Sequence, residues 1–268
     1  MTAVEKGRWA ELAYEAMAPA YDDFTAHHKY EALMEELLPA LERRGLTIGR
    51  LLDVGCGTGK SFLPMLPRGW QVTACDISPA MVELARTKVD DAVRLEVADM
   101  RDLPVFGEFD LVWAIDDAVN YLLDFDELRA ALAGMRSNLA TGGLLMFDVI
   151  TLAAYCSFFV GSEVVERDGL RLIRRGLASD DQPPGSIWAA QFEVEDASQS
   201  KEVKAHLHYQ RHFPEEEVLR ALRDAGLECL DVFGQHQDGI GLKQPLDEAK
   251  HTTAVYIARS MGADRRDL

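Results

Sequence analysis

The sequence predicts an α/β fold in which a mostly parallel β-sheet carries helices on both faces. Three observations lead to this prediction. An apolar run at residues 50–54 stops at a glycine-rich loop, 55–59, and two more apolar runs follow at 71–76 and 93–100. Helix-like segments separate these runs, and each run holds an aspartate at or near its end. Strands that alternate with helices in this way build parallel sheets, whose carboxyl ends form a ligand-binding edge.

The loop after the first strand narrows the kind of ligand. Glycine occupies positions 55, 57 and 59, so the backbone can adopt positive φ and a ligand can lie directly against it. A dinucleotide fingerprint has one more residue between its last two glycines, and the Lys-Ser pair after the third glycine has the wrong spacing for a P-loop. Asp53 favours a ligand with a cationic end. Thr58–Leu66 should be helical, although its proline keeps that helix short or kinked.

The run Leu-Leu-Asp-Val-Gly-Cys-Gly-Thr-Gly, residues 51–59, resembles motif I of class I S-adenosylmethionine-dependent methyltransferases. The resemblance implies a Rossmann-like seven-stranded sheet of order 3-2-1-4-5-7-6, with the last strand antiparallel and helices on both faces. It also implies S-adenosyl-L-methionine as the cofactor. We expect three parts: an N-terminal helical lid at 1–45, the cofactor-binding core at 46–155 and 213–262, and an antiparallel β-insert at 156–212 that covers the acceptor pocket.

Acidic residues end the next two strands where the family has them. Asp76 follows the loop by about 20 residues, and an acid there accepts hydrogen bonds from both ribose hydroxyls. In the family, Asp99 would accept from the adenine amino group, Met100 would flank the ring, and Asp53 would hold the ammonium group. Further cofactor contacts are expected from Gly55, Cys56, Gly57, Ile77 and Ile115.

The N-terminal segment has the apolar period of a helix over residues 8–44, and Pro19 should break it. Such a helix could simply cover the sheet. In the resembling enzymes a Tyr-Asp segment at this place folds over the cofactor as a lid. The resemblance therefore implies that Tyr14 and Tyr21 contact the cofactor or the substrate.

The segment after the fourth strand resembles the acceptor-binding stretch of one bacterial subgroup, which implies that Asp117, Asn120 and Tyr121 face the methyl acceptor. Asp116 and Asp117 could instead cap the following turn. In the insert, His208 and Arg211 are candidates for the pocket wall. The alternating histidines of that strand could bind zinc, but a solvated or pocket-lining face explains them equally, and we expect no metal.

These features predict an enzyme that transfers a methyl group to an N or O atom of a small molecule, such as a sugar or a secondary metabolite. Asp117 or His208 could act as the base, which only an acceptor that loses a proton would need. An alternative is a protein of the same fold that binds S-adenosylmethionine and catalyses a non-methylating reaction such as a cyclisation. A nicotinamide-dependent dehydrogenase is disfavoured by the glycine spacing.

Composition limits the partners. The formal net charge is −17 over 268 residues, which disfavours nucleic acid because phosphate backbones are bound by basic surfaces. The sequence has no apolar run long enough to span a membrane, so we expect no membrane partner. The four cysteines are widely separated, as in reduced cytoplasmic proteins. A homodimer is possible.

Overall fold

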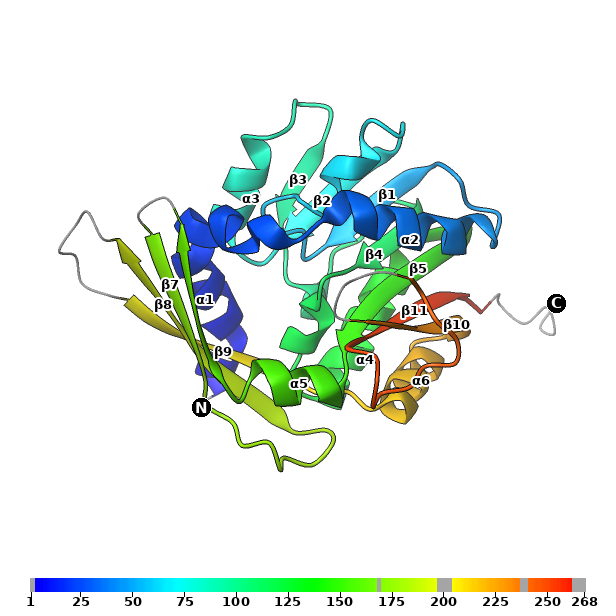
Figure 1. The fold of residues 1–268 in the computed structure, drawn as a ribbon. Coiled ribbons are helices and arrows are strands. Elements are labelled where there is room, and N and C mark those ends of the chain that lie inside the picture. The colour runs from blue at the N-terminus through cyan, green and yellow to red at the C-terminus, as the bar shows by residue number, and fades with distance from the viewer. Residues whose placement is uncertain (1–2, 168–169, 197–203, 237–240, 262–268) are drawn as a thin grey trace.

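The computed structural model describes residues 3–167, 170–196, 204–236 and 241–261, and these form two β-sheets with helices around them (Figure 1). The larger sheet has seven strands in the order β10-β11-β5-β4-β1-β2-β3. Strands β1 to β5 run parallel, whereas β11 pairs antiparallel with both β5 and β10. Numbered within this sheet alone, the order is 3-2-1-4-5-7-6 with the last strand antiparallel, so the predicted topology is confirmed. The strands are β1 (Arg50–Val54), β2 (Gln71–Asp76), β3 (Arg94–Val97), β4 (Phe109–Ala114), β5 (Leu139–Ile150), β10 (Leu227–Gln235) and β11 (Thr253–Ser260).

The second sheet is antiparallel, with the order β6-β7-β8-β9, and it follows β5 in the chain as predicted for the insert. Figure 1 shows helix α1 packed along this sheet. Met17 of α1 joins Trp188 and Tyr155 in a buried apolar cluster, so the N-terminal helix and the insert share one core. The strands are β6 (Ser162–Arg167), β7 (Leu170–Gly176), β8 (Ile187–Asp196) and β9 (Lys204–Arg211).

Helices cover both faces of the larger sheet. Adjacent residues of one strand point to opposite faces, so Val112 packs with α4 and α6 whereas Trp113 packs with α2. No helix within the described ranges is both long and apolar enough to cross a membrane. The α-helices are α1 (Ala3–Phe24), α2 (Tyr30–Glu42), α3 (Pro79–Arg86), α4 (Phe125–Ser137), α5 (Leu152–Phe158) and α6 (Glu215–Asp224). The short 3₁₀ helices are η1 (Thr25–His27), η2 (Leu63–Met65), η3 (Met100–Asp102) and η4 (Ala118–Tyr121).

Two predicted helix boundaries were wrong. Helix α1 continues through Pro19 to Phe24, because the exposed proline costs one backbone hydrogen bond while Met17 and its neighbours stay buried against the insert. The helix expected over Thr58–Leu66 is a series of turns with only the short η2, because Pro64 and the glycine loop interrupt regular hydrogen bonding.

Candidate active site

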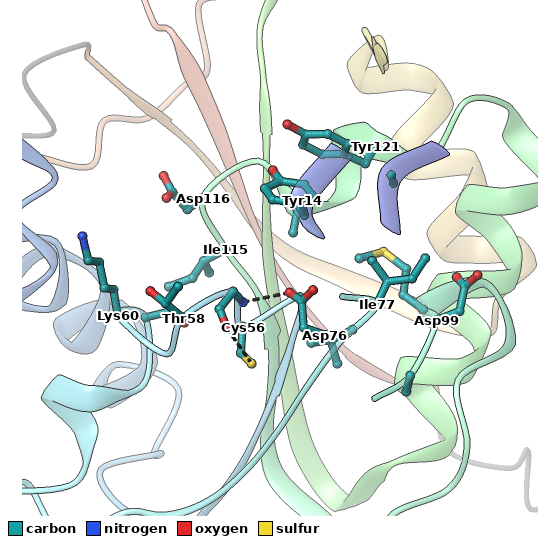
Figure 2. Close-up of a pocket in the computed structure, with 18 of the residues that line it drawn as sticks. Tyr14, Cys56, Thr58, Lys60, Asp76, Ile77, Asp99, Ile115, Asp116 and Tyr121 are labelled. Atoms are coloured by element: carbon teal, nitrogen blue, oxygen red, sulfur yellow. Dashed lines mark hydrogen bonds between the residues drawn. The ribbon is translucent and has the colours of Figure 1, made fainter. Parts of the chain in front are cut away.

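The glycine loop after β1 forms the floor of a cavity at the carboxyl edge of the sheet (Figure 2). Gly55 and Gly57 have φ of 78° and 52°, a region that residues with a Cβ atom rarely adopt. A Cβ atom at Gly55 would also lie 3.0 Å from the Cβ of Ala118. The loop therefore needs glycine both for its backbone conformation and for its close packing under the cavity.

Asp76 at the end of β2 fixes the loop from the neighbouring strand. One carboxylate oxygen accepts from the backbone N–H of Gly57 at 2.8 Å and the other from that of Ser78 at 2.9 Å. The side chain is 7% exposed and lines the cavity. Burial raises the pKa of Asp76, while the backbone N–H bonds work in the opposite direction. A carboxylate oxygen can accept more than one hydrogen bond, so Asp76 can also accept from hydroxyl groups of a ligand.

Asp99 lies after strand β3, directly before η3, and lines the same cavity together with Met100. Its carboxylate accepts from the backbone N–H of Arg101 at 2.9 Å and from the Arg101 side chain at 2.9 and 3.0 Å. Arg101 also lies 3.6 Å from Glu127 and lines the cavity, a role that sequence reasoning did not assign to it. Asp99 therefore lines the cavity with both of its carboxylate oxygens already bound by Arg101.

Most predicted cofactor contacts come together around this cavity. Figure 2 shows Asp76 and Asp99 on one side, with Tyr14 and Tyr121 above them and Asp116 across the space. The cavity also contains Lys60 and Tyr30, which sequence reasoning did not single out as ligand contacts. The predicted cofactor-binding residues that line it are Tyr14, Tyr21, Gly55, Cys56, Gly57, Asp76, Ile77, Asp99, Met100 and Ile115.

Asp53 differs from the prediction, since its side chain does not line the cavity. It lies beneath the loop, 1% exposed, and accepts from the hydroxyl of Ser61 at 2.5 Å. Burial raises the pKa of Asp53 to about 7, and the Ser61 bond opposes that rise. The structure therefore places Asp53 beneath the loop, where it supports the loop through Ser61.

Asn120 and Arg211, two residues expected to bind the substrate, form hydrogen bonds within the protein. The fully buried Asn120 side chain donates to the carbonyl of Arg211 at 3.0 Å and accepts from the backbone N–H of Ile150 at 3.0 Å. Arg211 donates to both oxygens of Glu217 at 3.0 Å and to the carbonyl of Gly185 at 3.1 Å. Neither residue is among those that line the two cavities, so the structure gives no support to the predicted substrate contacts. Their amide and guanidinium groups join the insert to the core.

Polar contacts hold helix α1 against the glycine loop. The carboxylate of Asp22 accepts from the hydroxyl of Thr58 at 2.6 Å and pairs with Lys60 and Lys88. Glu15 on the same helix accepts from the hydroxyl of Ser78 at 2.9 Å. These contacts join α1 to the glycine loop and to the start of α3.

A second cavity adjoins the first and has a volume of about 370 Å³, within the range of small-molecule sites. Phe158, Phe159 and Phe192 give it apolar walls, and Asp117, His208 and Gln210 add polar groups. The two cavities share four lining residues, which therefore lie at their boundary: Tyr14, Tyr21, Asp116 and Tyr121.

Asp116 and Asp117 adopt consecutive left-handed backbone conformations, with φ of 66° and 59°. The backbone N–H of Asp117 donates to the carboxylate of Asp148 at 3.0 Å, which holds the turn from strand β5. Asp116 accepts from the Tyr30 hydroxyl at 2.5 Å and lies 3.2 Å from Nδ1 of His28. Burial and the charge of Asp116 raise the pKa of Asp117 to about 7, and the bond from Gln210 opposes this rise.

His208 lies at the wall of the second cavity, 1% exposed. Its Nδ1 is 3.1 Å from the hydroxyl of Tyr121. We assign Tyr121 as the donor in this hydrogen bond, which places the ring proton of the neutral His208 on Nε2. Burial lowers the pKa of His208 to about 3, and nearby His206 adds to the effect. The ring is therefore neutral, with Nε2–H as its free donor.

The first cavity suits S-adenosylmethionine. The glycines of the loop line the cavity without side chains, Asp76 has acceptor capacity for two hydroxyls, and Ile77 and Ile115 provide apolar walls for a base. The acidic side chains suit the positive charge of the cofactor. Among the described residues no group of His, Cys, Asp and Glu is arranged to hold a metal ion.

Comparison with known proteins agrees with this geometry. Residues 51–143 match a family model described as "Methyltransferase domain". The chain is 33% identical over 204 residues to a 27-O-demethylrifamycin SV methyltransferase of Amycolatopsis mediterranei (strain S699), covering 69% of this chain and 73% of the relative. It is 27% identical over 199 residues to a dTDP-3-amino-3,4,6-trideoxy-alpha-D-glucopyranose N,N-dimethyltransferase of Streptomyces venezuelae, covering 74% and 83%.

A solved structure has the same fold. It is an S-adenosylmethionine-dependent methyltransferase from Clostridium acetobutylicum ATCC 824, with a TM-score of 0.73 at 20% identity, covering 93% of this chain and 99% of that one. The sheet order, the glycine loop beside Asp76 and the related sequences agree with one another. The chain belongs to the S-adenosylmethionine-dependent methyltransferase family, and it is an enzyme of that activity.

Proposed function

We propose that this methyltransferase acts on an N or O atom of a small molecule that binds in the second cavity. The observation that carries the proposal is the boundary of four residues shared by the two cavities, at which a cofactor and an acceptor would meet. The names of the two relatives support it, since one names an amino sugar as its substrate and the other a demethylrifamycin.

The residues would act mainly by positioning and by excluding water. When bound, S-adenosylmethionine supplies an electrophilic methyl group attached to a positively charged sulfur. Asp76 would hold the ribose, Asp99 and Met100 would face the base, and the rings of Tyr14 and Tyr21 would keep water from the reacting atoms. Burial raises the pKa values of both tyrosines well above their usual range, so their hydroxyls stay protonated.

Asp117 is the better candidate for a base than His208. With a pKa near 7 its carboxylate is ionised in part of the population at neutral pH and can still take a proton. His208 has a pKa near 3 and carries its proton on the nitrogen that is free to meet a ligand. We therefore propose that Asp117 accepts a proton and that His208 donates a hydrogen bond.

We propose the division into a lid (1–45), a core (46–155 and 213–262) and an insert (156–212) as the functional parts of the chain. In this proposal the lid and the insert enclose the acceptor between them, because α1 and β9 both contribute to its cavity. The enzyme would work in the cytoplasm, which agrees with four free cysteine thiols. A homodimer is a prediction that light scattering would test.

Incubation with methyl-labelled S-adenosylmethionine and a small-molecule extract of the source cells tests the proposed function. We expect S-adenosylhomocysteine to form together with a labelled product of low molecular mass. A product that lacks the label, formed together with other fragments of the cofactor, would instead support a cyclisation or another non-methylating reaction. Label found only in protein or nucleic acid would contradict the proposal of a small-molecule acceptor.

A further inference from the structure

The second cavity, called the acceptor cavity from here on, carries negative charge without a matching lysine or arginine. Asp116, Asp117 and Glu163 line it, and among the described lining residues there is no lysine or arginine. Glu163 is paired with Arg174, and Asp116 is held by Tyr30 and His28. Asp117 is different, because its side chain is held by the neutral amide of Gln210 at 2.5 Å. Its negative charge is therefore not balanced by the protein side chain that contacts it.

Two buried polar atoms in the same wall have no hydrogen-bond partner within the part of the chain that the structure describes. They are Nε2 of His208 and Oε1 of Gln210, on side chains that are 1% and 2% exposed. A buried polar atom without a partner costs about 1–3 kcal/mol, so a ligand that reached these two atoms would gain by completing them. Gln210 Oε1 can only accept, and His208 Nε2–H, as assigned above, can only donate.

We propose that the acceptor is an amine with a neighbouring oxygen atom, bound through the amine nitrogen at Asp117 and Gln210 and through the oxygen at His208. This inference rests on the proposed function and specifies its substrate class. The nitrogen would bind as an ammonium ion, whose N–H groups donate to the Asp117 carboxylate and to Gln210 Oε1. The oxygen, as in an amino alcohol, would accept from His208 Nε2–H.

The other acceptor classes fit less well. A carboxylate or phosphate at this place would lie against Asp117 with no cationic side chain among the described lining residues to offset the repulsion. A hydroxyl could contact Gln210, but it would leave the charge of Asp117 unbalanced in a partly buried site. The rings of Tyr14, Tyr21 and Tyr121 also favour a cation, because their faces attract positive charge.

The transfer balances with Asp117 as the proton acceptor. The carboxylate takes one proton from the ammonium, which frees the nitrogen lone pair. The nitrogen then bonds to the methyl carbon while the carbon–sulfur bond breaks and leaves its electron pair on sulfur. The positive charge thus moves from sulfur to nitrogen, and the methylated amine leaves as a cation. Asp117 returns its proton to solvent after the product departs.

The test uses S-adenosylmethionine labelled with ¹³C in its methyl group, the full-length enzyme and a small-molecule extract separated on a cation-exchange resin. We expect the label in the retained, cationic fraction, with the ¹³C chemical shift of an N-methyl group. Label on oxygen or carbon would overturn the inference while leaving the proposed function intact. Absence of any labelled small molecule would overturn both.

Variants then test the contacts with the purified amine. We expect Asp117→Asn to raise the KM of the amine about 10- to 100-fold, because it removes a charge-assisted hydrogen bond. His208→Phe should raise it about 3- to 10-fold, because it removes a neutral one. Asp126→Asn removes the same charge from an exposed site on α4 and should change nothing. Unchanged KM in Asp117→Asn, with binding of the cofactor retained, would overturn the inference.

Discussion

Replacing Asp76 by asparagine should weaken cofactor binding while the fold persists. In the original protein the two carboxylate oxygens accept from the backbone N–H groups of Gly57 at 2.8 Å and Ser78 at 2.9 Å. Asparagine keeps only one of these oxygens, and its NH₂ group faces the other N–H, to which it cannot bond. In the complex the variant also loses one acceptor for a ribose hydroxyl. A hydrogen bond to a charged group contributes about 1.5–3 kcal/mol, so we expect the Kd to rise about 10- to 150-fold.

The lost backbone bond should appear separately, as lower stability of the free protein. A buried N–H without a partner costs about 1–3 kcal/mol, and this cost falls on the enzyme with or without the cofactor. Isothermal calorimetry with S-adenosylhomocysteine measures the first effect, and urea unfolding of the ligand-free protein measures the second. The two measurements together separate binding of the ribose from support of the loop.

Asp110→Asn is a matched control. The Asp110 carboxylate accepts from the backbone N–H of Arg50 at 2.8 Å, at the opposite end of strand β1 from the glycine loop. The control should lose some stability and keep its Kd. If Asp76→Asn showed the same pattern, with a Kd within threefold of the original, Asp76 would support the loop without binding the ribose, and our reasoning would be refuted.

Three further predictions concern the loop, the lid and the base. Asp53→Asn should change the Kd of the cofactor by less than threefold, because Asp53 does not line the cavity. A 30-fold loss of affinity for the cofactor, measured by calorimetry, would contradict its supporting role. Since the folded pKa of Asp53 is raised to about 7, the original protein should lose up to about 4 kcal/mol of stability between pH 4 and 7, and the variant should lose less. Asp22→Ala removes the contacts with Thr58 and Lys88, worth about 1 kcal/mol at this partly exposed site, so stopped-flow release of the cofactor should be about fivefold faster; an unchanged rate would mean that the lid does not limit release. With Asp117 as the base, kcat/KM should rise with pH to a plateau above about 7, and Asp117→Asn should lack this rise. If the variant kept the same pH profile, the rise would belong to one of the other titratable groups around Asp117, which are Asp116, Asp148, His28, Tyr14, Tyr21, Tyr121 and His208.

The sequence was sufficient for the sheet and for most of the residues that line the first cavity, because local signals determine them. Glycine at alternate loop positions and an aspartate at the end of the second strand have few structural uses other than a nucleoside site at the edge of a parallel sheet. The position of Asp53 beneath the loop could have been expected from the same local pattern. It shares a strand face with Leu51, which packs beneath α2 with Trp113, so the period of two already directs its side chain into that layer.

The role of Asn120 could not be found in this way. Its hydrogen-bond partners, Ile150 and Arg211, lie 30 and 91 residues further along the chain, and both offer backbone groups that any sequence would provide. A polar residue after a strand at the active edge has the same local pattern whether it faces a ligand or joins distant segments. Only the packing of the insert on the core separates the two uses.

The strained turn at Asp116 and Asp117 is a feature of the site that the local sequence does not predict. A non-glycine residue in the left-handed region costs about 1–3 kcal/mol, and here two in succession are kept although glycine would relieve the strain. Glycine would, however, remove the carboxylates that face the acceptor cavity. The bond from Asp117 N–H to Asp148 offsets part of the cost, and it comes from a neighbouring strand that the local sequence does not reveal. The strain lies at the boundary of two cavities and is stabilised from outside the turn. It therefore indicates that the position of the two carboxylates is kept at a cost in backbone stability.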